Sequence, residues 1–250
     1  MVHPDHLLEK FKHKTPDVVY HIGAISSTTE TNTELIAENN ILFSCKLLEY
    51  CISKGVPLVY ASSASVYGLG TNGFSEDASP TPLNYYAMSK SFFDQIVNQK
   101  IKDFPNCKVV GLRYFNVYGT GEEHKADMAS PVHKFIKQSR DFGQIKIFEG
   151  SEQFFRDFIH VSDVAKITLK SFNFNSGVYN VGTGYPRSFR HVAEIISSLT
   201  NSKIIEIPFP KHLVGKYQNY TCSDNKKIYN FLTISDRLTL EEGIRLTYDE

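Results

Sequence analysis

The 250-residue sequence predicts an α/β fold, in which a doubly wound parallel sheet is followed by a smaller C-terminal lobe. Apolar, β-branched runs recur at regular intervals through the first half of the chain, and stretches with apolar residues at helical spacing separate them. Strands that alternate with helices are typical of a parallel sheet. After residue 119 the alternation loosens, so we expect one lobe over residues 1–119 and another over 120–250, with segments of the second returning to the sheet.

Two runs in the first half predict strands of this sheet, DVVYHIGA (17–24) and VPLVYASS (56–63), and CKVVGLRYFNVYG (107–119) predicts a third strand that runs into a loop. Two stretches between them predict helices, one over residues 34–53, which Gly55 closes, and one over 84–102.

Shorter elements are predicted in the second half. We expect helices in MASPVHKFIKQSR, at the end of RDFIHVSDVAKITLKSF, and after Ser188, whose hydroxyl can cap a helix. Short strands are predicted in IKIFEG, at the start of RDFIHV, in GVYNVGTG and in KIIEIPFP.

Polar loops follow the three strands of the first half: GAISSTTE, ASSASVYG and NVYGTGEEHK. Parallel sheets of this kind bind ligands beyond the carboxyl ends of their strands. These loops therefore predict a ligand site at that edge.

Composition excludes several classes of protein. The chain has 27 basic and 27 acidic residues, which predicts no nucleic-acid partner and no anionic membrane partner. It has no apolar run long enough to span a bilayer, and its first residues lack the apolar core of a secretory signal. The four cysteines are scattered, so we expect reduced thiols in a cytoplasmic protein and no metal site.

Two Tyr-x-x-x-Lys pairs occur, Tyr50 with Lys54 and Tyr86 with Lys90, and on a helix each pair shares a face. The first pair ends a helix just before Gly55, where a lysine suits the helix dipole, so we interpret it as structural. Tyr86 instead begins a helix after a Pro-rich loop, and Ser63, at a strand end, could bond the same substrate oxygen. We expect Tyr85 to be a packing residue.

Five motifs carry a resemblance to a known family: YASSASVYG, NYYAMSK, LRYFNVYG, RDFIHVSDVA and YNVGTG. They resemble the nucleotide-sugar epimerases and dehydratases, the extended branch of the short-chain dehydrogenases/reductases. Four longer stretches resemble the ADP-L-glycero-D-manno-heptose 6-epimerase family: GAISSTTETN, GTGEEHKADMAS, FEGSEQFFRDF and IPFPKHLVGKYQNYT. The resemblance runs from about residue 17 to the end.

The resemblance implies a Rossmann-type sheet, with residues 1–119 as a partial dinucleotide-binding domain and 120–250 as mainly a substrate-binding lobe. It also implies that NADP, with NAD as the alternative, takes hydride from C6 of the heptose and returns it to the other face of a 6-keto intermediate. Ser63, Tyr86 and Lys90 would be catalytic, and Lys90 would lower the tyrosine pKa and hold the nicotinamide ribose. Lys125 would be the second base, which a lysine can be where it is desolvated; read without the family, it is a solvated surface lysine.

Further roles follow from the same resemblance. The cofactor-binding residues would be Gly23, Ala24, Ser26, Asn39, Lys90 and Val117. The residues that bind an ADP-heptose-type nucleotide sugar would be Asn116, Phe148, Glu149, Gly150, Ser151, Arg156 and Tyr217. Arg156 could instead pair locally with Asp157. The family also implies a homo-oligomer, a homopentamer.

The element that opens this family, a strand followed by the glycine loop G-x-G-x-x-G and a helix, is missing before the first predicted strand; the Gly-x-Gly pairs at 68–70, 119–121 and 182–184 lie in later loops. The first predicted strand corresponds to the fourth of the family, so we expect an incomplete sheet that lacks its first strands, a separate N-terminal fragment as a potential partner, and weak NADP binding by the chain alone. Two alternatives remain open. One is another nucleotide-sugar epimerase or dehydratase, although the Asp-Glu pair typical of dehydratases is absent after SASVYG. The other is a non-catalytic remnant that binds a sugar nucleotide.

Overall fold

The computed structural model describes residues 9, 11, 14–211, 218–232 and 237–249. The chain forms two compact units, each built from several segments. The first contains the residues up to Gly68, Glu76–Tyr114 and Ile167–Asn180; the second contains Leu69–Ser75, Phe115–Lys166 and the residues from Val181 onward. The division expected at residue 119 stays a prediction.

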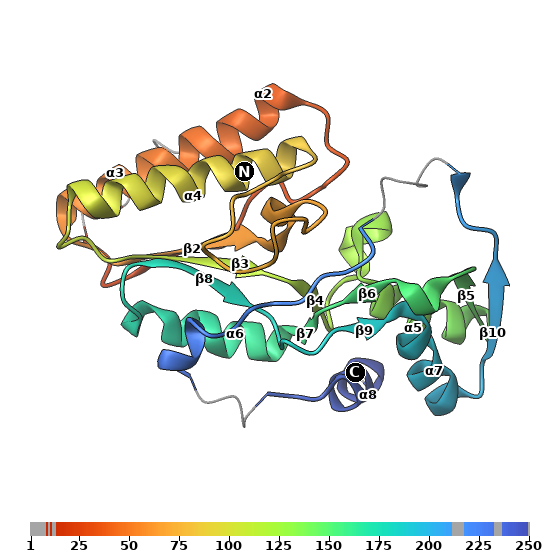
Figure 1. Cartoon of the computed structure of the whole chain (residues 1–250). Helices are drawn as coiled ribbons and strands as arrows, with labels where there is room; N and C mark the ends of the chain where they lie inside the picture. The colour runs from red at the N-terminus through yellow and green to blue at the C-terminus, as the bar shows by residue number, and fades with distance from the viewer. Residues whose placement is uncertain (1–8, 10, 12–13, 212–217, 233–236, 250) are drawn as a thin grey trace. The chain divides into compact units, whose positions relative to one another are not determined.

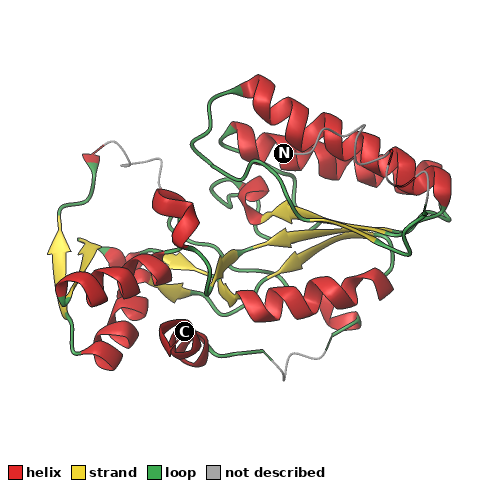
Figure 2. Cartoon of the chain, turned by 180° about the vertical axis from the view of Figure 1, so that it is seen from behind, coloured by secondary structure: helices red, strands yellow, loops and turns green. Residues whose placement is uncertain are grey.

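A four-stranded sheet forms the centre of the first unit. Its order is β1-β2-β3-β8, with bounds Val19–His21, Leu58–Ser63, Val109–Tyr114 and Gly177–Val181. The pairs β1–β2 and β2–β3 are parallel, in a register that sets Tyr20 beside Val59 and Val59 beside Val110. The strands lie side by side in Figure 2. The predicted α/β fold with a parallel sheet is confirmed.

Helices cover one face of this sheet, where α3 and α4 lie side by side (Figure 1). The helix expected over 34–53 is a continuous helical segment with a π-helical middle: α2 Thr33–Ile36, a π turn Ala37–Leu42 and α3 Phe43–Lys54. Gly55, at φ 65°, ends it as predicted, because glycine adopts this left-handed backbone without strain. The second helix, α4, runs over Tyr85–Asp103, close to its predicted bounds.

The opposite face is covered by the end of α6 (Val161–Lys170), which begins in the second unit and ends in the first. Tyr20 Oη donates a hydrogen bond to the carbonyl of Leu169 at 3.0 Å, and the hydroxyls of Tyr114 and Thr168 lie 2.8 Å apart. The apolar core of the unit joins Leu47 of α3, Leu58 of β2 and Phe93 of α4. Helices on both faces make the sheet doubly wound, as the sequence predicted.

Within the described residues, the second unit combines three two-stranded pairs with three helices and the start of α6. The parallel pairs are β4 (Asn116–Tyr118) with β7 (Phe158–His160) and β5 (Gln144–Phe148) with β10 (Lys203–Ile207); β6 (Phe155–Arg156) pairs antiparallel with β9 (Arg187–Ser188). The helices are α5 (Pro131–Phe142), α7 (Phe189–Thr200) and α8 (Leu240–Asp249). Ser130 and Ser188 cap α5 and α7 with their side chains, the second as predicted. The core of the unit packs Ile136, Ile145 and Ile196.

The strand predicted within 107–119 is present as β3. It ends at Tyr114, and the chain then pairs elsewhere: the backbone N–H of Phe115 donates to Val181 at 3.0 Å and that of Asn116 to Asp157 at 3.0 Å. The start of the predicted loop, Asn116–Tyr118, forms the additional short strand β4.

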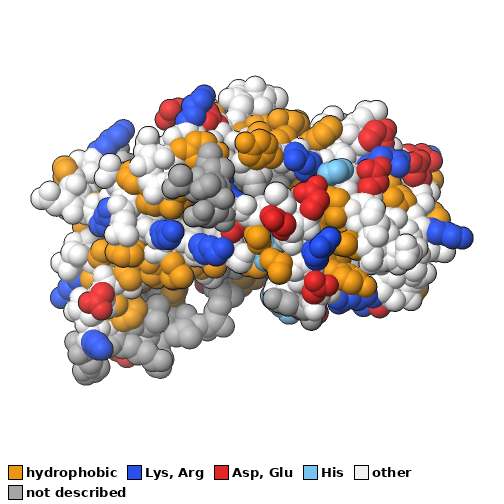
Figure 3. Space-filling model, turned by 90° about the horizontal axis from the view of Figure 1, so that it is seen from below, with side chains coloured by type: hydrophobic (Ala, Val, Ile, Leu, Met, Phe, Trp, Pro, Cys, Tyr) orange, Lys and Arg blue, Asp and Glu red, His pale blue; other side chains and the backbone are white. Residues whose placement is uncertain are grey.

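The surface of the chain reflects its balanced composition of acidic and basic residues. On the face shown in Figure 3, basic and acidic side chains are interspersed. Within the described ranges, no helix has both the length and the apolarity to cross a bilayer. Cys45, Cys51, Cys107 and Cys222 are free thiols.

Candidate functional site

Ser63, Tyr86 and Lys90 come together in the first unit. Ser63 is the last residue of β2, and the Asn84 side chain, which accepts a hydrogen bond from the N–H of Ala87 at 2.8 Å, fixes the start of α4. Tyr86 therefore lies in the first helical turn and Lys90 one turn later, on the same face. Ser63 and Tyr86 share a side-chain hydrogen bond, and Lys90 Nζ lies 5.9 Å from the centre of the Tyr86 ring.

Opposing effects shift the pKa of the Tyr86 phenol. Burial raises its pKa, the hydrogen bond with Ser63 lowers it, and the negative charge of Asp94 raises it again. The balance leaves the pKa above its ordinary value, so the phenol carries its proton at neutral pH. Ser63 is therefore the partner that moves Tyr86 toward the phenolate in this structure.

Lys90 is a buried ammonium, 7% exposed, and donates a hydrogen bond to the carbonyl of Ala61 at 2.7 Å. Burial lowers its pKa to about 8, against the opposing effect of Asp94. An ammonium has three donors, and within the described part of the chain Ala61 takes one of them. The residue therefore fits the role of holding ribose hydroxyls of a nicotinamide cofactor.

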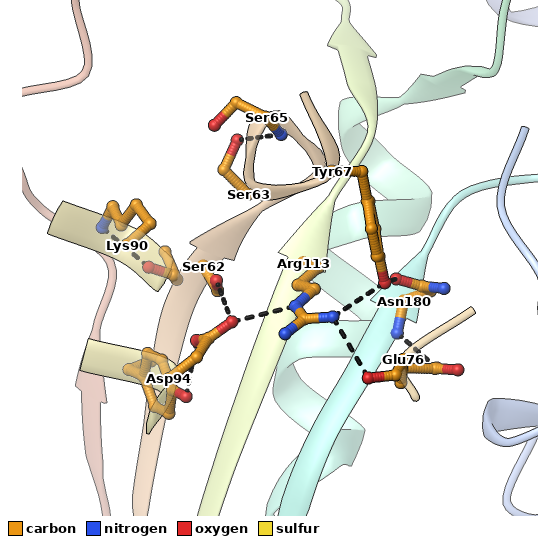
Figure 4. Close-up of polar contacts among 11 residues, drawn as sticks. Ser62, Ser63, Ser65, Tyr67, Glu76, Lys90, Asp94, Arg113 and Asn180 are labelled. Carbon is orange, nitrogen blue, oxygen red and sulfur yellow. Dashed lines mark hydrogen bonds and ion pairs between the residues drawn. The ribbon is translucent and has the colours of Figure 1, made fainter. Parts of the chain in front are cut away.

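A buried polar network beneath these residues was missed by sequence reasoning (Figure 4). Asp94 is 1% exposed and accepts hydrogen bonds from Tyr60 Oη at 2.8 Å, Ser62 Oγ at 2.9 Å and Arg113 Nε at 2.9 Å. Asp94 follows Lys90 by four residues, as Lys90 follows Tyr86, so helical spacing was the signal that could have found it. The contact from Ser62 ties α4 to β2 at the residue before Ser63.

Arg113 extends the network to residues far away in sequence. Its Nη1 donates to Tyr67 Oη at 2.9 Å, and Tyr67 donates to Asn180 Oδ1 at 2.7 Å. The backbone N–H of Asn180 in turn donates to Glu76 Oε1 at 2.8 Å. These contacts tie β3, β8 and the loop after Ser63 together (Figure 4).

Ser65 is a second hydroxyl near Ser63. Its backbone N–H donates to Ser63 Oγ at 3.2 Å, and its own Oγ is buried with no hydrogen-bond partner among the described residues. A buried hydroxyl without a partner is costly, which makes Ser65 a candidate ligand contact beside Ser63.

The loop after β1 carries Gly23, Ala24 and Ser26, three of the predicted cofactor contacts. A Cβ at Gly23 would meet no atom within 4 Å, so the backbone is openly accessible there. The predicted Asn39 donates to the carbonyl of Leu35 at 2.8 Å, inside its own helix.

Its neighbour Asn40, which sequence reasoning missed, makes the tertiary contacts of this region. Asn40 Oδ1 accepts from the N–H of Ile25 at 2.9 Å, and its Nδ2 donates to the carbonyl of Ile25 at 2.9 Å and to Ser89 Oγ at 3.0 Å. Asn40 is 2% exposed, and it fastens the loop after β1 to α4 beside Lys90.

Tyr85 is 47% exposed, so the expectation that it packs inside is wrong. Asn84 caps α4 and sets Tyr85 at its first position, on the face that Met88 and Phe92 continue at helical spacing. Those two side chains are 48% and 50% exposed. That face points away from Tyr86 and Lys90.

Two of the predicted substrate residues line one cavity of the second unit. Its volume is about 340 Å³, and Phe148, Phe154 and Phe189 supply aromatic walls. Ser151 also lines it; the residue is 2% exposed, and its Oγ has no hydrogen-bond partner among the described residues. Apolar walls with a buried hydroxyl suit a planar ring with a polar edge. Glu149 is exposed, and Gly150, at φ 77°, forms the turn that leads to Ser151.

The remaining predicted residues of the second unit lie on short strands. Arg156 is 7% exposed, lies 5.3 Å above the Phe189 ring and donates to the carbonyl of Phe155 at 2.8 Å. Asn116 Oδ1 accepts from Thr221 Oγ1 at 3.4 Å, and Val117 is half-buried in β4. Tyr217 lies outside the described residues.

Lys125 lies in the second unit, within a 3-10 turn, Glu123–Met128, that precedes α5. Its side chain is 41% exposed, and its Nζ lies 3.4 Å from Glu122 Oε2. The desolvation that a lysine base requires is therefore incomplete in this structure.

Comparisons with known proteins agree with this arrangement. The sequence pattern of the NAD dependent epimerase/dehydratase family matches residues 1–182. The ADP-L-glycero-D-manno-heptose-6-epimerase of Brachyspira hyodysenteriae is 44% identical over 231 residues, which are 90% of this chain and 72% of that protein. The protein of the same name from Alkalilimnicola ehrlichii is 43% identical over 217 residues, which are 83% of this chain and 67% of that protein.

Solved structures give the same result. The crystal structure of Helicobacter pylori ADP-L-glycero-D-manno-heptose-6-epimerase matches with a TM-score of 0.86 at 31% identity, over 100% of this chain and 77% of that one. Thermus thermophilus UDP-glucose 4-epimerase, in complex with NAD, matches with a TM-score of 0.81 at 26% identity, over 98% of this chain and 81% of that one. The resemblance inferred from the motifs is confirmed, and the chain belongs to the NAD dependent epimerase/dehydratase family, as an epimerase.

Proposed function

We propose that this epimerase inverts C6 of the heptose of an ADP-glycero-manno-heptose, through transient oxidation to a 6-keto intermediate with NADP. The observation that carries the proposal is the Ser63–Tyr86 hydrogen bond beside the buried Lys90. The heptose follows from the two relatives at 43% and 44% identity. The choice of NADP over NAD follows from the resemblance of the motifs.

Tyr86 exchanges the proton of the reacting hydroxyl. In the oxidation its phenolate would take the proton, and a bound nicotinamide would supply the hydride acceptor; in the reduction its phenol can return a proton. Ser63 can donate a hydrogen bond to the same substrate oxygen, and the nearby Lys90 ammonium favours the phenolate. The raised pKa of Tyr86 suits the proton-donating step, and the hydrogen bond with Ser63 suits the proton-accepting one.

Lys125 is proposed as the second base. The carbinol proton of the two epimers leaves from different positions, so one base takes a proton during oxidation and the other gives one during reduction. Net protonation of the substrate is then unchanged over the cycle. The support for this role is the match of EEHKADMAS to the family.

Binding roles complete the proposal. Gly23, Ala24, Ser26, Asn39 and Val117 contact the cofactor, and Lys90 holds its nicotinamide ribose. The cavity of Phe148 and Ser151 takes the adenine, because aromatic walls and a buried hydroxyl suit it. Arg156 pairs with the phosphates through its planar guanidinium. Asn116, Glu149, Gly150 and Tyr217 bind the rest of the nucleotide sugar, in a cytoplasmic homo-oligomer.

The experiment incubates the purified chain with one C6 epimer of ADP-glycero-manno-heptose and a large excess of NADP, because weak NADP binding by the chain alone is expected, and follows the other epimer by proton NMR. Wild type should form it, and Tyr86→Phe should reduce the rate at least about 10³-fold, because it removes the proton-transferring group. Tyr50→Phe is the matched control, since Tyr50 and Lys54 repeat the spacing without Ser63; its rate should stay at wild type. Absence of epimer with wild type, or full activity of Tyr86→Phe, would overturn the proposal.

A further inference from the structure

Glu122 is a buried carboxylate that joins three parts of the second unit. It is 4% exposed. Its Oε1 accepts from the N–H of Gly119 at 3.2 Å and from Ser130 Oγ at 2.7 Å, and its Oε2 accepts from the N–H of Ser130 at 2.8 Å. One side chain thus links the end of β4 to the N-cap of α5, and the turn with Lys125 lies between these points.

Glu122 also holds Lys125 directly. The Nζ lies 3.4 Å from Glu122 Oε2, and the backbone N–H of Lys125 donates to the carbonyl of Glu122 at 2.9 Å. Other charged or titratable groups nearby are Glu123, His124 and Asp127 on the same turn and His133 and Lys134 on α5. Within the described ranges, Glu122 is the carboxylate at ion-pair distance from Lys125.

The backbone of this loop is constrained at both ends. A Cβ at Gly119, where φ is 152°, would lie 2.4 Å from Val161 Cγ1, so the loop can start there only with glycine. Ala126, next to Lys125, has φ 45°, a conformation that costs a non-glycine residue about 1 kcal/mol or more. Other contacts must offset the conformational cost at Ala126 for the turn to keep this shape. The hydrogen bonds that Glu122 accepts at both ends of the turn are such contacts.

We propose that Glu122 is a positioning residue: its carboxylate holds both the turn and the ammonium of Lys125, and so sets where that lysine presents its nitrogen. This inference rests on the proposed function for the meaning of Lys125, but its geometry is independent of any substrate. Glu122 does not itself touch the reacting atoms. It orients the residue that does.

The test measures the chemical reactivity of the Lys125 amine and requires no catalytic turnover. Trace acetylation of the folded chain with acetic anhydride at pH 8, read by peptide mass spectrometry, gives the rate at which Lys125 reacts. An amine held in an ion pair reacts more slowly than a free one, so loss of the carboxylate partner should speed labelling. Glu122→Gln, which keeps the shape and removes the charge, should raise the Lys125 rate about threefold, the size expected when a half-exposed ion pair is lost. Lys54, an exposed lysine of the first unit, is the internal reference.

Glu123→Gln is the matched control, because it removes the same charge from the adjacent, exposed position. Its Lys125 rate should equal wild type. A wild-type rate in Glu122→Gln, or an equal rise in Glu123→Gln, would overturn the proposal. If Glu122→Gln does not fold, Glu122→Asp decides: a carboxylate one methylene shorter moves away from Lys125, so the rate should rise about twofold, and an unchanged rate overturns the proposal.

Activity gives a second readout that a purely structural residue would not produce. In Glu122→Gln, kcat for epimerisation should fall about tenfold while KM changes little, because a mispositioned base slows the chemical step rather than binding. A rise in KM with unchanged kcat would contradict the positioning role. Faster labelling in a chain that forms no epimer would overturn the proposed function and leave the geometry of Glu122 supported.

Discussion

Asp94 and Arg113 form an ion pair, with Nε 2.9 Å from Oδ2, in which both side chains are at most 4% exposed. The pair joins α4, which carries Tyr86 and Lys90, to β3 in the middle of the sheet. Removing one member leaves the other charge buried without its partner, which is more costly than losing the pair itself.

The first prediction therefore concerns stability. Arg113→Met should lower the free energy of unfolding by about 3–5 kcal/mol, measured by urea denaturation. Lys137→Met is the control, because Lys137 pairs with Asp141 at 2.7 Å on the surface, where both partners are over 40% exposed. That change should cost less than about 1 kcal/mol. Similar losses in the two variants would contradict the prediction.

The second prediction concerns the pH dependence of stability. Burial lowers the pKa of Lys90 to about 8 in the folded chain, from 10.5 for an ordinary lysine. Between these values the unfolded chain binds a proton that the folded chain does not, so wild-type stability gains a contribution that rises with pH from about 8 to 10.5. Below pH 8 the cost of burying the charged ammonium is fully present.

Lys90→Met removes this cost at every pH. Its stability relative to wild type should be highest below pH 8 and should decline by about 2–3 kcal/mol as the pH rises to 10.5. Urea denaturation of both proteins at pH 7.0 and 10.0 measures the difference. Lys54→Met, at the exposed lysine of the other Tyr-x-x-x-Lys pair, should show no such trend, and a pH-independent difference for Lys90→Met would refute the linkage.

A third prediction concerns Ser63. Because its hydrogen bond lowers the pKa of Tyr86, Ser63→Ala should raise that pKa further. Epimerisation at neutral pH should fall about 10²-fold, and the rise of rate with pH should move to higher pH, since less phenolate is present at a given pH. Initial rates between pH 6 and 10 measure both effects.

The control for this experiment is Ser53→Ala, which removes an exposed hydroxyl that donates to the carbonyl of Tyr50 at 2.9 Å. Its pH profile should superimpose on that of wild type. Coincident profiles for Ser63→Ala and wild type would show that Ser63 does not tune the tyrosine.

The fourth prediction compares two adjacent asparagines. Asn40→Ala removes the acceptor of the Ile25 N–H and should destabilise the loop after β1 by about 1–3 kcal/mol, so the Ile25 amide should exchange with solvent roughly tenfold faster or more. Hydrogen-exchange mass spectrometry of this loop measures it. Asn39→Ala breaks only a contact within its own helix and should leave that exchange unchanged.

Much of the local structure could be predicted from the sequence because it depends on near neighbours. Gly55 ends a helix and Ser188 begins one for reasons contained in a few residues. The same holds for the shared helical face of Tyr86 and Lys90, and the position of Ser63 at a strand end follows from one apolar run.

The features that could not be predicted depend on contacts between residues that lie far apart in the chain. Arg113 is the charged residue of an otherwise apolar strand. The sequence does not show that its partner is Asp94, because only the fold brings the two side chains together. The short strand Asn116–Tyr118 was predicted as loop, because its partner strand, Phe158–His160, lies far along the chain. Tyr85 was misassigned because its face of α4 depends on the helix start that Asn84 fixes.

The π turn over Ala37–Leu42 has a consequence for substitutions and deletions in this helix. Such a turn behaves as one residue inserted into an α-helix, and each residue advances the side-chain direction by about 100°. Removing any one residue between 37 and 42 would restore regular α-helical winding. The side chains that precede the deletion would then rotate by about 100° relative to those of α3. Either Asn40 would then lose its hydrogen bonds to Ile25, or Leu47 and Leu48 would leave the apolar core. We therefore expect the segment to tolerate substitutions far better than deletions.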